Sequence, residues 1–176
     1  MYLANAFKIA IEFVLDREGG YSLDRNDPGN WTKGAVNAGI LKGTKYGISA
    51  AQYPVGIDIE QLTPDQAAEI YRHDYWDKCK CDSIPGPVAI LIFDSSVNQG
   101  VPTACHILQQ ACGVKEDGII GPGTLQAVNK HGVVELVDEV MVRRMTRYGM
   151  TDGFARYGLG WSRRLAACYK LALRYA

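Results

Sequence analysis

The chain begins with a helical pattern whose apolar face ends in a carboxylate. Phe7, Ile11 and Val14 recur at the spacing of one helical face, and Glu18 occupies the next position on it. The pair Gly19-Gly20 follows at once, and glycine readily takes the left-handed conformation that closes a helix. The pattern therefore predicts a first helix that ends at Glu18 and holds this side chain at a rigid, apolar helix end.

Glu18 is oddly placed for an acidic residue. The C-terminal end of a helix disfavours negative charge, and the apolar positions before it do the same. Both influences favour the protonated carboxyl that a general acid needs near neutral pH. A solvated last-turn glutamate before an ordinary glycine cap is the simpler interpretation, and the position alone leaves both open.

The segment from Ser22 to Gly47 is polar and rich in glycine, so it cannot continue as a helix. We expect a loop or a short irregular hairpin. Loops of this length inside a compact domain are uncommon and tend to be functional.

Asp27 lies in this flexible segment, nine residues after Glu18. An acid on a rigid helix end and a carboxylate on a neighbouring loop are what glycoside hydrolysis requires. One group donates a proton to the leaving oxygen, while the other activates water or stabilises the developing oxocarbenium ion. The chain holds 19 acidic residues, which offer many other pairs, so this pairing is unspecific on physical grounds alone.

The remaining sequence reads as helices separated by proline and glycine. Residues 63–66 have the form of a capping box, which begins a helix running to about Asp77. Further helices are predicted over residues 88–100, 102–113, 124–129, 133–147 and 161–175, with a loop over residues 149–160. Extended pieces are expected only between residues 22 and 57. We therefore predict a mostly helical fold with the glycine-rich loop or hairpin after its first helix.

Length and composition exclude several protein classes. The 176 residues are 47% hydrophobic and 22% charged, which is typical of one globular domain, with or without a small appendage. No apolar run reaches the roughly 18 residues needed to span a bilayer. The N-terminus lacks the basic leader, apolar core and cleavage site of a signal peptide. We expect a soluble protein without an export signal.

Cysteine and histidine usage gives no sign of a metal or cofactor. The five cysteines are an odd number without the spacing of a disulfide scaffold, so we expect reduced, partly buried thiols. Cys79 and Cys81 lack a matching second pair, which argues against zinc. The histidines show no ligand spacing, and no phosphate-binding or dinucleotide motif is present.

The C-terminal part of the chain is basic. After residue 140 the only acidic residue is Asp152, whereas eight residues are basic, namely Arg143, Arg144, Arg147, Arg156, Arg163, Arg164, Lys170 and Arg174. Such a tail can meet an anionic polymer, although the solvated sides of amphipathic helices explain it more simply. Nucleic-acid binding is the weakest interpretation, and we predict none.

Several short motifs occur in an order that resembles one enzyme family. The first half contains Glu18-Gly19-Gly20-Tyr21, Asp27-Pro28-Gly29, Gly43-Thr44-Lys45-Tyr46-Gly47-Ile48-Ser49 and Tyr71-x-x-x-Tyr75-Trp76. Together they resemble the N-acetylmuramidases of glycoside hydrolase family 108, which include phage endolysins and bacterial secretion activators. The second half contains Phe93-Asp94, Asn98-Gln99-Gly100, Leu108-Gln109, Asp117-Gly118-Ile119-Ile120-Gly121-Pro122 and Thr124-Leu125. These resemble the predicted peptidoglycan-binding domain that follows in that family.

The resemblance covers nearly the whole chain and implies a lysozyme-like helical fold. It implies a muramidase region over residues 1–98 and a peptidoglycan-binding region over residues 99–176, which we expect to pack as one compact unit. It also implies hydrolysis of the β-1,4 bond between N-acetylmuramic acid and N-acetylglucosamine, without a cofactor or metal. Glu18 matches the catalytic acid of the family.

For the residues that act with Glu18, the sequence offers alternatives. Asp27 is the candidate second carboxylate, since its spacing from Glu18 also resembles phage lysozymes. A catalytic threonine is either Thr32, by spacing, or Thr44, which better matches the Thr-x-Tyr-Gly-Ile of the family. An extra stretch, Lys33 to Lys42, lies between them. Whether the reaction inverts or retains depends on the carboxylate separation.

Candidate substrate contacts are aromatic and amide side chains. Four aromatic residues can stack on sugar rings or pack in the core, namely Tyr21, Tyr46, Tyr75 and Trp76. Asn98 and Gln99 either bind an N-acetyl group or form an ordinary helix end. Asp94 lies among apolar residues and is interpreted as a structural carboxylate.

We expect a monomeric, bacteriolytic endolysin-type enzyme, made in the bacterial cytoplasm and acting on periplasmic peptidoglycan once a holin gives access. Two rival interpretations stay open. One is a non-catalytic peptidoglycan-binding or secretion-accessory protein that keeps the fold. The other is a lytic transglycosylase, which needs one carboxylate and leaves a 1,6-anhydro end. Phage or bacterial origin, peptidoglycan chemotype and independent wall binding by the second half also stay open.

Overall fold

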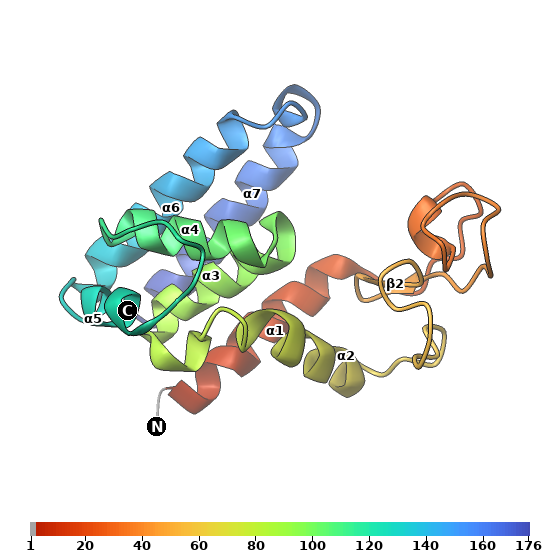
Figure 1. Ribbon diagram of the computed structural model, residues 1–176, viewed down its shortest axis with the longest axis horizontal. Coiled ribbons are helices and arrows are strands. Elements are labelled where there is room, and N and C mark those ends of the chain that lie inside the picture. The colour runs from red at the N-terminus through yellow and green to blue at the C-terminus, as the bar shows by residue number, and fades with distance from the viewer. Residues whose placement is uncertain (1–2) are drawn as a thin grey trace. The chain divides into compact units, whose positions relative to one another are not determined.

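The computed structural model describes residues 3–176, with side chains from Ala6 onward, and its fold is mostly helical (Figure 1). The α-helices are α1 (Leu3–Glu18), α2 (Pro64–Tyr71), α3 (Gly86–Gln99), α4 (Val101–Ala111), α5 (Pro122–Val128), α6 (Val133–Gly149) and α7 (Phe154–Leu173). Short 3-10 turns are η1 (Pro28–Asn30) and η3 (Cys81–Ser83), a π-helical turn is η2 (Arg72–Trp76), and the strands are β1 (Thr44–Lys45) and β2 (Ile48–Ser49).

The described residues divide into two compact units. Residues 11–71 form the first, which we call the hairpin unit, and residues 3–10 with 72–176 form the second, which we call the helical unit. The functional boundary expected near residue 98 stays a prediction. No helix in the described part of the chain is long and apolar enough to cross a membrane.

The helical unit is built around α3. Residues 87–96 of this helix are all buried, because apolar side chains from Val88 to Phe93 cover its whole circumference. Helices α4, α6 and α7 pack against it, as Figure 1 shows. Phe7, Trp76 and Phe93 meet edge to face, with ring centroids 5.1 to 5.8 Å apart. Trp76 is therefore a core residue in this structure.

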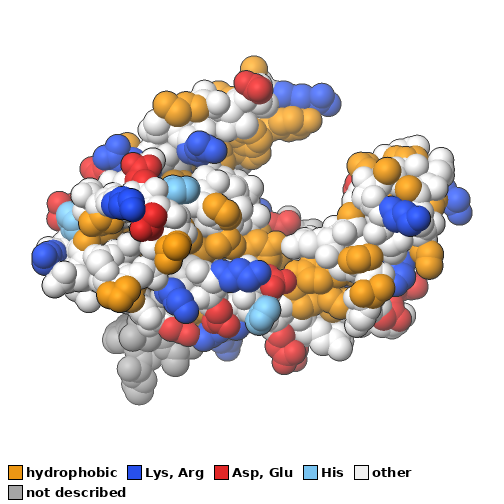
Figure 2. Space-filling model, viewed as in Figure 1, with side chains coloured by type: hydrophobic (Ala, Val, Ile, Leu, Met, Phe, Trp, Pro, Cys, Tyr) orange, Lys and Arg blue, Asp and Glu red, His pale blue; other side chains and the backbone are white. Residues whose placement is uncertain are grey.

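A buried ion pair crosses the same core. Arg144 of α6 is 0% exposed and donates from Nη2 to Asp94 Oδ2 of α3 at 2.7 Å. Arg164 of α7 donates to the other oxygen of Asp94 at 2.9 Å. The buried, satisfied carboxylate predicted for Asp94 is thus found, while the absence of a catalytic role stays a prediction. Arg144, in contrast, does not lie on a solvated helix face. Other charged side chains of both signs are interspersed on the visible surface of this unit (Figure 2).

Most predicted helices are confirmed. Thr63 and Gln66 form the expected capping box, with Thr63 N to Gln66 Oε1 at 3.0 Å and Gln66 N to Thr63 Oγ1 at 3.2 Å. All five cysteines are free and buried, and on these points the prediction of reduced thiols is confirmed.

The loop predicted over residues 149–160 is wrong for most of its length. Helix α7 begins at Phe154, seven residues before the predicted Trp161. Gly158, inside the predicted loop, is buried in this helix, and a Cβ there would lie 2.7 Å from the Phe154 ring. The glycine makes room for an aromatic side chain one turn earlier and does not end the helix.

The hairpin unit contains the predicted short hairpin. Strands β1 and β2 are antiparallel, with Thr44 opposite Ser49 and Lys45 opposite Ile48. The two-residue turn between them, Tyr46-Gly47, has φ values of 52° and 74°, as expected for the tight turn that matches strand twist. Tyr46 takes this left-handed conformation although it carries a side chain, which marks the turn as strained.

Candidate active site

Glu18 lies directly against the hairpin turn. Gly19, with φ of 76°, closes α1, and its carbonyl accepts a hydrogen bond from Tyr46 N at 3.2 Å. The Glu18 side chain is half-buried. A Cβ at Gly47 would lie 2.9 Å from Glu18 Oε2, which is closer than real Cβ contacts allow. The turn therefore packs on the Glu18 carboxyl with no room for a further side-chain atom.

Tyr71 supports this turn from the other side. It is the last residue of α2, is 3% exposed, and donates from its hydroxyl to Tyr46 O at 2.8 Å. The same hydroxyl oxygen would lie 2.6 Å from a Cβ at Gly47. Sequence reasoning did not place Tyr71 in the site, although it stands in the Tyr71-x-x-x-Tyr75-Trp76 motif.

Thr44 is anchored beside the end of α1. Its backbone pairs with Ser22 in both directions, at 2.8 and 2.9 Å. Its hydroxyl donates to Asn30 Oδ1 at 2.7 Å, and the Asn30 amide donates in turn to Asp24 O at 2.9 Å. Since the single hydroxyl proton is used by Asn30, the lone pairs of Thr44 Oγ1 can accept a hydrogen bond from water.

Asn30 is a buried hub that sequence reasoning missed. Its side chain is 0% exposed, and its main-chain carbonyl accepts from Lys42 N at 2.9 Å and from Gly43 N at 3.1 Å. The only signal in the sequence was its position directly after Pro28-Gly29, within the motif region. Its burial, which requires hydrogen-bond partners for the side chain, is visible only in the structure.

The two other loop candidates have local structural contacts. Asp27 is exposed and caps η1, with its Oδ1 accepting from Gly29 N at 2.8 Å. Thr32 Oγ1 accepts from Ile40 N at 2.9 Å and so closes the loop formed by the extra stretch. The catalytic roles of Asp27 and of a threonine stay predictions.

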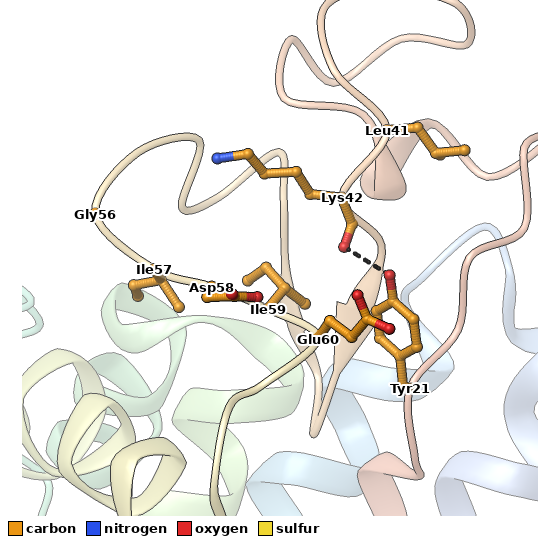
Figure 3. A pocket seen from close by; sticks show the side chains of 8 residues that line it. All are labelled: Tyr21, Leu41, Lys42, Gly56, Ile57, Asp58, Ile59 and Glu60. Atoms are coloured by element: carbon orange, nitrogen blue, oxygen red, sulfur yellow. Dashed lines mark hydrogen bonds between the residues drawn. The ribbon is translucent and has the colours of Figure 1, made fainter.

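A pocket of about 460 Å³ opens beside Tyr21 (Figure 3). Its lining residues are Tyr21, Leu41, Lys42, Gly56, Ile57, Asp58, Ile59 and Glu60. The Tyr21 hydroxyl donates to Lys42 O at 3.3 Å, and the Glu60 carboxyl lies next to the tyrosine ring in the figure. Burial raises the pKa of Tyr21, and the carboxylates of Glu60 and Asp58 raise it further. These two acidic residues were missed in the sequence.

Lys45 and Tyr46 complete this part of the hairpin unit. Lys45 Nζ donates to Glu60 O at 2.7 Å and lies 5.7 Å from the centroid of the Tyr46 ring. These contacts tie the 58–60 segment, which lines the pocket, to the hairpin. Glu18, Tyr21, Asp27, Thr44 and Tyr46 thus all lie in the hairpin unit.

The other candidates belong to the helical unit. Tyr75 is half-buried in the π-helical turn η2. Asn98 is exposed at the end of α3, where its Oδ1 accepts from the Tyr148 hydroxyl at 2.6 Å. Gln99 Oε1 accepts from Ser95 Oγ at 3.0 Å. Among residues with described side chains, no three histidine, cysteine or acidic groups come together as metal ligands.

Comparison with known proteins assigns both halves of the chain. Residues 11–100 match the sequence profile of the family described as Glycosyl hydrolase 108, and residues 103–166 match that of the Predicted Peptidoglycan domain. The solved structure of SagA from Brucella abortus is similar, with a TM-score of 0.80 and 28% sequence identity over 98% of this chain and 96% of that one. No curated protein matches.

Proposed function

The chain belongs to the glycosyl hydrolase 108 family, and from this premise we propose that it cleaves the β-1,4 bond between N-acetylmuramic acid and N-acetylglucosamine, with Glu18 as general acid. The family makes it a glycoside hydrolase with a lysozyme-like helical fold, and the peptidoglycan domain gives peptidoglycan as its substrate polymer. The bond, the acid and an endolysin role are the proposed part.

The position of Glu18 is the observation that carries this proposal. A general acid must be held within hydrogen-bond reach of the glycosidic oxygen, and small displacements are costly in rate. Glu18 stands at the end of a long helix, under a strained turn whose Gly47 leaves space only for the carboxyl. Tyr71 fixes that turn through the carbonyl of Tyr46. The carboxyl at the end of α1 is thus held in one position, which supports a catalytic role for Glu18.

In the proposed reaction Glu18 gives its proton to the leaving glycosidic oxygen as the bond to C1 of N-acetylmuramic acid breaks. Water then adds to C1 and passes its proton to a carboxylate that acts as base, which is Asp27 in an inverting reaction or the ionised Glu18 in a retaining one. Thr44 can hold this water, because its own proton is used by Asn30 and its oxygen accepts. Attack from the face opposite the leaving group gives inversion, whereas covalent capture of C1 by a carboxylate such as Asp27 gives retention.

The pocket beside Tyr21 suits a sugar ring next to the cleaved bond. Tyr21 follows Glu18 by three residues, and its ring forms an apolar wall with a polar tip. Asp58 and Glu60 supply acceptors for sugar hydroxyls, and Lys42 supplies a donor. We assign this pocket to substrate binding.

The test compares wild type with Glu18→Gln on permeabilised Gram-negative cell walls, following turbidity and identifying fragments by mass spectrometry. Glutamine keeps the shape but cannot donate the proton, so we expect a rate loss of roughly a hundredfold or more. Glu12→Gln is the matched control, because Glu12 is an exposed glutamate of the same helix. The expected products carry reducing N-acetylmuramic acid ends.

Other results would select a different function. Lysis by folded Glu18→Gln at the wild-type rate would remove Glu18 from the reaction. Wall binding without any fragment release by wild type would favour an accessory binding protein. Fragments with 1,6-anhydro ends would identify a lytic transglycosylase. That mechanism needs only one carboxylate, so Asp27 could serve solely as the cap of η1.

A further inference from the structure

The two amides at the end of α3 are oriented by one buried guanidinium. Arg144 pairs with Asp94 and donates from Nη1 to Leu91 O at 3.2 Å, so it is fixed in place. A guanidinium has donors and no acceptor. Any oxygen next to Arg144 must therefore accept a hydrogen bond from it. This fixes the orientation of the polar side chains around Arg144.

Asn98 is oriented through Tyr148. The Tyr148 oxygen lies 3.5 Å from Arg144 Nη2, which drives its hydroxyl proton to the opposite side. That proton reaches Asn98 Oδ1 in a short bond of 2.6 Å. Asn98 consequently turns its carbonyl oxygen inward and its NH₂ group outward.

Gln99 is oriented by the same rule. Its Oε1 lies 3.4 Å from Arg144 Nε and also accepts from Ser95 Oγ at 3.0 Å. The NH₂ group of Gln99 is left on the other side. No acceptor among residues 6–176 is hydrogen-bonded to Asn98 Nδ2 or Gln99 Nε2, so both groups are available to a ligand.

These amides line a pocket of about 230 Å³ within the helical unit. Besides Tyr148, its lining comprises Asn98, Gln99, Thr103, Arg147, Thr151 and Trp161, with no acidic residue. The Trp161 ring stacks on Tyr148 with centroids 5.3 Å apart and forms a flat apolar wall. Arg147 is exposed, and no carboxylate in the described part of the chain pairs with it. The lining of this pocket thus combines two amides whose NH₂ groups are available with one unpaired cation.

We propose that this pocket binds a carboxylate of the peptidoglycan stem peptide; this rests on the proposed function, whose polymer carries such peptides. A carboxylate accepts from several donors at once and pairs with a guanidinium, which matches Asn98, Gln99 and Arg147. The apolar wall of Trp161 suits the small side chain beside a terminal carboxylate. Glycan hydroxyls, which both donate and accept, make less use of a site dominated by donors.

The protein would then have a second binding site, which recognises the stem peptide and takes no part in bond cleavage. Cell walls with stem peptides should be bound more tightly than glycan strands whose peptides have been removed. The carboxylate, and not the sugar, would select the substrate at this pocket.

The test measures binding by the full chain in the Glu18→Gln background, which leaves the wall intact. The probes are a synthetic stem pentapeptide, the same peptide with an amidated C-terminus, and an N-acetylglucosamine tetramer, each titrated by calorimetry. We expect the free peptide to bind and Arg147→Gln to weaken it by about tenfold or more. Arg143→Gln is the matched control, since Arg143 lies on α6 and pairs with exposed Glu139 at 3.1 Å.

A second variant tests the orientation itself. Tyr148→Phe keeps the ring on Trp161 and removes the proton that turns Asn98, so peptide binding should fall while circular dichroism stays unchanged. Equal binding of free and amidated peptide, equal binding by the Arg147 and Arg143 variants, or binding of the tetramer instead of the peptide would each overturn the proposal. Lysis by the otherwise wild-type chain is scored separately. Its absence contradicts the proposed function, whereas failure of peptide binding with intact lysis contradicts only this inference.

Discussion

A Cβ at residue 47 would stand 2.9 Å from Oε2 of Glu18, so Gly47 and Glu18 share one packed space. The same position would be 2.6 Å from the Tyr71 hydroxyl. Gly47 has φ of 74°, and both its conformation and its missing side chain are needed here. The turn is thus matched to the carboxyl it covers.

Gly47→Ala should therefore displace Glu18. We expect lytic activity to fall by more than tenfold and the free energy of unfolding by roughly 1–2 kcal/mol from the left-handed conformation, plus the clash. Gly113→Ala is the control, because Gly113 has φ of 64° with nothing within 4 Å of a Cβ. This variant has the strain of a left-handed alanine but no clash with a neighbouring side chain. Equal activity of the two variants would show that the Gly47 contact does not position Glu18.

Tyr71→Phe should loosen the turn without emptying the core. The ring stays buried, while the 2.8 Å bond to Tyr46 O is lost. We expect about 1 kcal/mol less stability in urea denaturation and a several-fold lower kcat. Tyr169→Phe, which removes an exposed hydroxyl bonded to Asp138, should leave kcat unchanged. A Tyr71→Phe enzyme with wild-type kcat would restrict Tyr71 to packing.

Thr44 and Thr32 can be separated by one matched pair of variants. Thr44→Val leaves the buried Asn30 Oδ1 without its donor, so we expect a loss of about 1–3 kcal/mol and a strong loss of activity. Thr44→Ser should restore both. Thr32→Val removes only an acceptor at an exposed loop base and should retain activity. The reverse ranking in lytic assays would assign the catalytic threonine to Thr32.

The buried thiols predict a loss of stability in alkali. The hydrogen bond with Cys105 lowers the pKa of Cys79, but the hydrogen bond with Cys81 and burial outweigh it and raise this pKa from 9.0 to about 12. Burial alone raises the pKa of Cys112 from 9.0 to about 11. Between these values the unfolded chain ionises while the folded chain does not, so unfolding releases protons. The contribution of these thiols to the free energy of unfolding is therefore fully present below pH 9, and it is lost as the pH rises towards 12.

Urea denaturation between pH 8 and 11 measures this slope, and Cys79→Ala should reduce it. A thiol reagent at pH 8 should leave the five cysteines unmodified in the folded protein and react with all of them in denaturant. Rapid modification of the folded protein would contradict the burial.

Local signals carried much of the fold. The Thr63–Gln66 capping box and the glycines after Glu18 predict helix ends from neighbouring residues, and both ends are found. The loop predicted over residues 149–160 is wrong from Phe154 onward, because the glycine at residue 158 makes room for the Phe154 ring inside a continuous helix.

The parts of the site that sequence reasoning missed depend on distant partners. Arg144 reads as one more cation on an amphipathic helix until Asp94, 50 residues earlier, is brought beside it. Asn30 and Tyr71 likewise gain their roles only when the hairpin folds onto them. Family resemblance pointed to Glu18, while its bracing became visible only in three dimensions.

The Asp94–Arg144 pair predicts a variant that loses stability and keeps its chemistry. Asp94→Asn leaves the fully buried guanidinium, and Arg164 beside it, without a balancing charge, so the free energy of unfolding should fall by about 3–5 kcal/mol. Glu139→Gln breaks an exposed pair and should cost about 0–1 kcal/mol. Below its lowered unfolding temperature, Asp94→Asn should still lyse walls, unlike Glu18→Gln, which should stay stable and inactive. A folded but inactive Asp94→Asn would instead place Asp94 in the reaction, because loss of a structural charge alone leaves Glu18 and its turn unchanged.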